Sequence, residues 1–120
     1  MDSILNSVKK MLGIQEEYEV FDQDIIMHIN SVFMILNQMG VGPSKCFSIC
    51  DSSSSWDEFN QGDDTLESVK SYMYMKVRIM FDPPQNSVVM ESINKVINEL
   101  EFRLKVAADL SANKNSDDSE

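Results

Sequence analysis

The chain has 120 residues, of which 42% are hydrophobic, and this length and composition are typical of one soluble globular domain. Its 20 acidic residues outnumber its 10 basic ones, and the net charge of −10 argues against binding to nucleic acid or to an anionic membrane. The sequence contains no apolar run long enough to cross a membrane, so we expect no membrane partner.

The first predicted helix covers residues 3–12, where apolar side chains recur at helical spacing and Gly13 stands at the expected stop. The cations of this segment follow its apolar residues, which is not the pattern of a signal peptide. We therefore expect the protein to be made in a reducing cytoplasm.

The second predicted helix covers residues 22–39, after an acidic linker at residues 14–20. Asp22 and Asp24 stand where a carboxylate can cap free backbone N–H groups. The helix is apolar nearly all round, so we expect its own fold to bury one side and another molecule to cover the other. Three helix-breaking residues follow it: Gly40, Gly42 and Pro43.

Residues 44–60 are the least helical part of the chain. Phe47 and Ile49 alternate with smaller side chains, a pattern that predicts a short strand. Within a strand, Cys46 and Cys50 would be roughly 13 Å apart, which is too far for a disulfide. We expect two buried or half-buried thiols instead.

A short helical turn is predicted at the WDEF sequence, where Trp56 and Phe59 should anchor the preceding serine-rich loop to the core. The next long helix should begin at Asp63 and Asp64. It carries the Met-rich, aromatic sequence YMYMKVRIMF and is followed by residues that form a proline corner: Asp82, Pro83 and Pro84.

The last predicted helix is capped by Asn86 or Ser87. Its predicted inner face consists of Val89, Ile93, Val96, Leu100, Leu104 and Ala107. Three acid-before-base pairs should strengthen it: Glu91 with Lys95, Glu99 with Arg103, and Glu101 with Lys105. We expect a single domain at residues 1–110 and a disordered acidic tail at 111–120.

The sequence offers no set of residues for catalysis or for a metal. His28 is the only histidine and lies in the middle of a helix, so no base stands near a nucleophile. A calcium loop beginning at Asp51 would place Trp56 and Gly62 where glycine and glutamate are required. We therefore predict that the protein is not an enzyme and uses no cofactor or metal.

These elements predict a mainly α fold, a small bundle of about four helices with a minor β element between the second and third major helices. The nine methionines leave two interpretations open. They fill the core, or some of them form an adaptable contact surface, because methionine repacks easily against different partners.

The order of these segments resembles the head–tail connector (head-completion adaptor) proteins of tailed phages. The resemblance runs from about Phe21 to Ala108, and it is most specific at VKSYMYMKVRIMFDPP and at the later ELEFRL sequence. It implies a structural virion protein at the head–tail interface. Such proteins form a ring, of the dodecamer type, below the portal; the ring supports the stopper or tail-completion protein and continues the DNA channel without specific DNA binding.

The resemblance also suggests where contacts lie. We predict a subunit interface on the helix before the proline corner, at Tyr72, Tyr74, Met75, Lys76, Arg78 and Ile79. We predict portal contact at Arg103, Lys105 and Leu110. The alternative function is a small acidic helical regulator or DNA mimic that binds a host or phage protein, which would need carboxylates spread along one exposed face.

Overall fold

The computed structural model describes residues 3–60 and 65–118, with side chains up to residue 110. This part of the chain contains five helices and no strand, which confirms the predicted mainly α fold. The helices are α1 (Ile4–Leu12), α2 (Asp22–Gln38), α3 (Trp56–Phe59), α4 (Leu66–Phe81) and α5 (Ser87–Asp118). Asp63 and Asp64, the predicted start of the fourth helix, lie outside the described residues.

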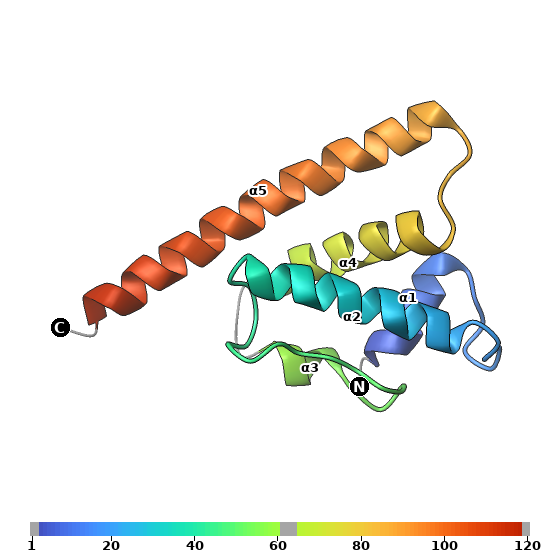
Figure 1. The fold of residues 1–120 in the computed structure, drawn as a ribbon, viewed down its shortest axis with the longest axis horizontal. Helices are drawn as coiled ribbons and strands as arrows, with labels where there is room; N and C mark the ends of the chain where they lie inside the picture. The colour runs from blue at the N-terminus through green and yellow to red at the C-terminus, as the bar shows by residue number, and fades with distance from the viewer. Residues whose placement is uncertain (1–2, 61–64, 119–120) are drawn as a thin grey trace.

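Helix α4 is the centre of the bundle. It packs against α1, α2 and α5, and α1 also packs against α2. Figure 1 shows α5 crossing above α4, with its C-terminal part extending beyond the body formed by the other helices. The molecule is consequently long and flat, with extents of 51 × 35 × 19 Å.

Helix α1 ends at Gly13 as the sequence predicts, and it begins one residue after the predicted Ser3. The Ser3 hydroxyl accepts a hydrogen bond from the Asn6 backbone N–H at 3.2 Å, so Ser3 caps the first turn. Gly13 ends the helix with a φ of 80°, a conformation that costs a glycine little.

Helix α2 presents one face to the core and another to solvent. Ile25, Ile29 and Leu36 are buried, whereas Met27 and Met34 are exposed. The predicted capping by carboxylates is wrong, because no side chain caps this helix and Asp22 instead forms an ion pair with Lys9. Met73 of α4 is fully buried, so methionine fills part of the core, while a contact surface formed by the exposed methionines remains a prediction.

The predicted β element after α2 is wrong. The Asn30 side chain donates to the Ile49 carbonyl at 2.9 Å and accepts from the Ile49 N–H at 2.8 Å. A single amide therefore satisfies the backbone groups that a neighbouring strand would otherwise pair. Among the described residues, the β pairing is one isolated bridge between Ser3 and Ser55.

The two cysteines are exposed and free, so the prediction of buried or half-buried thiols is also wrong. Phe47 and Ile49 pack inward even without a strand, and Ile49 is buried. Because alternate side chains of an extended segment point to opposite sides, Cys46 and Cys50 face outward.

The loop that follows is anchored by aromatic side chains, as predicted. Trp56 and Phe59 are buried, and their rings meet Phe33 of α2 at centroid distances of 6.2 and 5.1 Å. The Trp56 indole N–H donates to the Ser7 hydroxyl of α1 at 2.9 Å, which satisfies its polar group.

The proline corner between α4 and α5 is confirmed. Asp82 leaves helical geometry with φ −147° and ψ 74°, and its N–H bonds the Arg78 carbonyl at 2.8 Å. Pro83 and Pro84 follow, and the Asn86 carboxamide oxygen then accepts from the Val88 N–H at 2.8 Å. Asn86 is therefore the cap of the last helix.

The inner face of α5 differs from the prediction at two positions. Val89 and Val96 are exposed, and Ile97 is the buried residue of this region. A line of three- and four-residue steps can be drawn through either Val96 or Ile97, and only contact with α4 decides between them. The other four predicted positions are buried or half-buried: Ile93, Leu100, Leu104 and Ala107.

Helix α5 continues to Asp118, through most of the segment predicted to be disordered. Residues 111–118 contain neither glycine nor proline, and extending an existing helix is far easier than starting one. The division into a domain at 1–110 and a separate tail remains a prediction.

Candidate assembly surfaces

Helix α4 buries part of the subunit interface that the sequence predicts. Tyr72 is 0% exposed, and its hydroxyl donates to a Glu101 carboxylate oxygen of α5 at 2.7 Å. Its predicted place in the interface is therefore wrong. Met75 and Ile79 are half-buried against the core.

The two predicted interface cations lie against aromatic side chains of their own helix. The Lys76 ammonium is 5.9 Å from the centroid of the Tyr72 ring. The Arg78 guanidinium donates to the Tyr74 hydroxyl at 3.1 Å. Both cations are half-buried, and their role in an interface remains a prediction.

A second candidate surface lies on the outer side of α5. Phe102, Val106 and Leu110 are 69%, 40% and 64% exposed. They are four residues apart, so they form one stripe along the helix, called here the outer stripe. Arg103 and Lys105, the other predicted portal contacts, are exposed on the same part of α5.

One of the three predicted ion pairs of α5 is present among the described residues. The Arg103 guanidinium contacts the Glu99 carboxylate at 2.5 Å, and both side chains are exposed. Such a pair contributes little to folding. Glu101 instead bonds Tyr72, which leaves Lys105 without the predicted partner.

The α1–α2 loop, residues 14–21, forms a structured surface where the sequence predicts only a linker. Lys9 is 1% exposed, and its ammonium donates to the carbonyls of Glu16 and Tyr18 at 2.9 and 2.8 Å. It also lies 2.8 Å from Asp22 Oδ1, an ion pair without hydrogen-bond geometry. The sequence contains a signal for the burial of Lys9, because Lys9 follows Leu5 by four residues and Leu5 is on the apolar, buried side of α1.

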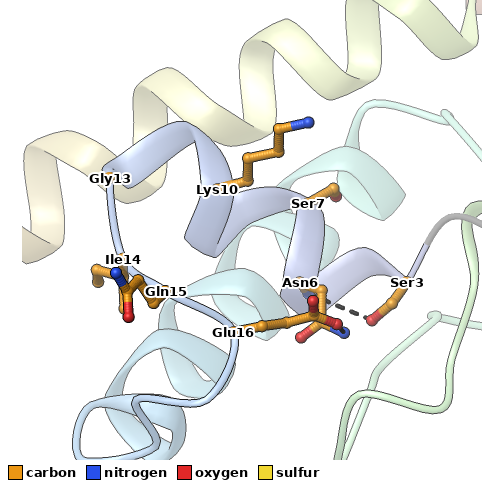
Figure 2. A pocket seen from close by; sticks show the side chains of 8 residues that line it. All are labelled: Ser3, Asn6, Ser7, Lys10, Gly13, Ile14, Gln15 and Glu16. Atoms are coloured by element: carbon orange, nitrogen blue, oxygen red, sulfur yellow. Dashed lines mark hydrogen bonds between the residues drawn. The ribbon is translucent and has the colours of Figure 1, made fainter.

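Two hollows flank the exposed side of α1. The larger, of 560 Å³, lies between α1 and the start of the α1–α2 loop. Figure 2 shows Asn6 and Glu16 side by side in it, in agreement with their 2.6 Å hydrogen bond, while Lys10 extends away from the loop.

The smaller hollow, of 320 Å³, is a groove between α1 and α4. Trp56 contributes to it, and the two hollows share Ser7 and Lys10. We call it the α1–α4 groove; its lining includes Val8, Met11, Trp56 and Tyr74, together with Lys10 and Lys70.

The described residues contain no group of three His, Cys, Asp or Glu side chains that could hold a metal ion. His28 lies with its ring 6.5 Å from that of Phe81, in an edge-on arrangement. No helix in the described part of the chain is long and apolar enough to span a membrane.

Comparison with known protein families identifies the family to which this chain belongs. The family model described as phage connector protein matches residues 4–111. The chain belongs to this phage connector family. The resemblance found in the sequence is thereby confirmed, and the match extends over α1 and nearly all described side chains. Searches of curated proteins and of solved structures returned no match.

Membership in the connector family indicates the general role of the protein and the kind of partner it has. The protein is a structural connector component of a phage, and it associates with head or tail components of the virion. The family is structural, which supports the prediction that the protein is not an enzyme.

Proposed function

We propose that this connector forms a ring below the portal, joins the phage head to the tail and continues the DNA channel. The main evidence for this proposal is the outer stripe of α5. Helix α5 buries Ile97 and Leu104 on its inner side, yet it exposes Phe102, Val106 and Leu110 on the other. A helix that is apolar on two sides has a second partner to cover it.

The position of the outer stripe favours the portal as that partner. Among the side chains that the structure describes, Ala108 is the last of α5 to pack on the core, and the helix continues for ten further residues, to Asp118. Figure 1 accordingly shows the C-terminal part of α5 projecting beyond the body. A projecting helix with an apolar stripe suits insertion into a groove of another protein.

The charge of the chain suits a channel through which DNA slides. A net charge of −10 repels phosphate, so a ring of such subunits presents a wall to which DNA does not adhere. The outer stripe is apolar and lies beside the Glu99–Arg103 pair, not a row of carboxylates. It therefore gives no support to the alternative of a DNA mimic.

The test is to mix the protein with the portal protein of the same phage and to image the product. Wild-type protein should form rings on the portal, with a stopper or tail-completion protein binding to the opposite side. The double variant Phe102→Ser, Leu110→Ser should bind the portal at least about tenfold more weakly, because exposed aromatic anchors dominate such contacts.

Val88→Ser is the matched control, since Val88 is 68% exposed on the same helix but near its other end. It should bind like the wild type. Wild-type protein that stays monomeric both alone and with the portal contradicts the proposed function. Equal binding by the double variant contradicts the assignment of the outer stripe.

A further inference from the structure

The α1–α2 loop is a fixed projection that is both acidic and apolar. Tyr18, Val20 and Phe21 are exposed hydrophobic residues, and Glu17 and Glu19, on either side of Tyr18, are also exposed. The Phe21 ring also meets Phe81 edge-on at 5.3 Å, which ties the end of the loop to α4. Together with the Lys9 contacts, this packing holds the loop in one shape, so little order has to be gained on binding.

The α1–α4 groove has complementary chemistry. Met11 is exposed at its edge and the half-buried Tyr74 supplies aromatic surface, whereas Trp56, which also lines the groove, is only 2% exposed. Lys10 is exposed there and makes no ion pair within the described residues. Lys70 lies 5.9 Å from the centroid of the Trp56 ring. The Lys70 ammonium also lies 3.9 Å from the Glu67 carboxylate of the same helix.

The loop does not reach the groove of its own subunit. Lys9 holds the loop on one side of α1, whereas Met11 lies two residues further on, about 200° around the helix. The groove therefore faces away from the loop that its own chain supplies, and a loop that enters it comes from another molecule.

We propose that the α1–α4 groove of one subunit receives the α1–α2 loop of the next. The carboxylates of Glu17 and Glu19 would meet Lys10 and Lys70, while Tyr18 and Val20 would cover Met11 and Tyr74. The two surfaces differ and lie on opposite sides of α1, so the contact is head-to-tail and repeats from subunit to subunit. This inference rests on the proposed ring and names the surfaces that build it.

The test exchanges the charges of the two surfaces. Variant A carries Lys10→Glu, and variant B carries Glu17→Lys with Glu19→Lys. Each variant alone should lose self-association at least about tenfold, because like charges then face each other. An equimolar mixture should recover association, since each groove again meets a loop of opposite charge. Light scattering after size-exclusion chromatography measures both outcomes.

Lys45→Glu is the control, because it makes the same charge change as variant A at an exposed lysine outside the groove. It should assemble like the wild type, and circular dichroism should show all variants folded. Assembly of A and B like the wild type overturns the inference and leaves the proposed ring intact. Loss of assembly without recovery in the mixture also overturns it, and indicates that another partner covers one of the surfaces.

Cross-linking tests the same contact without altering charge. In a chain with Cys46→Ser and Cys50→Ser, the pair Met11→Cys and Val20→Cys should form disulfides between subunits on oxidation. A ladder of dimers, trimers and longer products is expected, because a head-to-tail contact does not end at two copies. The pair Met11→Cys and Val88→Cys should give no ladder, and equal ladders from both pairs overturn the inference. Wild-type chains that never assemble refute the proposed ring itself.

Discussion

At the scale of single residues, Gly42 stands in the turn after α2 with a φ of 91°. A Cβ atom at this position would lie 2.6 Å from Phe59 Cε1, inside the aromatic anchor. Gly13 has a similar φ of 80°, but a Cβ there would meet nothing within 4 Å. Substituting each of the two glycines therefore distinguishes the energetic cost of backbone strain from the cost of steric overlap.

We expect Gly42→Ala to lower the free energy of unfolding by about 2–3 kcal/mol, because strain and overpacking add. Gly13→Ala should cost only about 1 kcal/mol, the strain of the left-handed backbone alone. Urea denaturation of both variants measures the difference. Equal costs would mean that Phe59 moves aside freely and does not fix the loop.

Lys9 is a buried cation whose three oxygen partners come from the α1–α2 loop and the start of α2. Replacing it with methionine keeps much of the volume but leaves two carbonyls without their donor and the Asp22 carboxylate without its opposite charge. We expect Lys9→Met to cost about 3 kcal/mol in urea denaturation, as for removal of one partner of a buried pair.

Lys45→Met is the control for Lys9→Met, because Lys45 is exposed, and it should change the stability by no more than about 0.5 kcal/mol. If Lys9→Met proves equally neutral, the loop is not held by this ammonium group. The α1–α2 loop would then lack the fixed shape that the proposed contact between subunits requires.

At the scale of elements, the contact between α4 and α5 contains a titratable pair. Burial raises the pKa of Tyr72 above its ordinary value of 10.0, and the hydrogen bond to the Glu101 carboxylate raises the pKa further. The folded state therefore favours the neutral hydroxyl. Its stabilising effect is complete below pH 10 and is lost as the pH rises above it, because the unfolded chain then ionises first.

We expect the free energy of unfolding of the wild type to fall, between pH 10 and 11, by about 1 kcal/mol more than that of Tyr72→Phe. At pH 7 the same substitution should cost about 1 kcal/mol, the net value of one hydrogen bond. Chemical denaturation at each pH provides both numbers. Parallel pH profiles for the two proteins would contradict burial of the hydroxyl in the α4–α5 contact.

The helices themselves were predicted well because their signals are local. The Gly13 and Gly40 stops and the proline corner each act within a few residues of the helix end that they define. The strand prediction failed because the partner of Ile49 is a side chain of α2, 19 residues away. Nothing in the local pattern distinguishes pairing with Asn30 from pairing with another strand.

At the scale of the whole molecule, α5 divides into a part that packs on the body and a part that leaves it. Leu104 is buried and Ala108 still touches the core. A chain that ends at Leu110 should therefore keep its thermal midpoint within about 2 °C of the wild type, because it keeps all the α5 side chains that are described as packing on the core. Its helical circular dichroism signal should decrease.

A chain that ends at Arg103 is the comparison, since it also lacks Leu104 and Ala108. It should lose about 2–5 kcal/mol of stability, as for deletion of a buried leucine. A chain ending at Leu110 that melts as early as this one would show that the projecting end supports the body, which would contradict its proposed availability to the portal.

The sequence by itself determined the helices, the glycine stops of α1 and α2, the proline corner, the aromatic anchor at Trp56 and Phe59, and a resemblance that the family match confirmed. These features depend on neighbours along the chain or on runs of residue types. The tertiary structure alone decided that Tyr72 faces inward, that Lys9 is buried and that Ile97 replaces Val96 in the core. The reason is physical: the side of a helix that is covered depends on its partners, and α4 has partners on three sides.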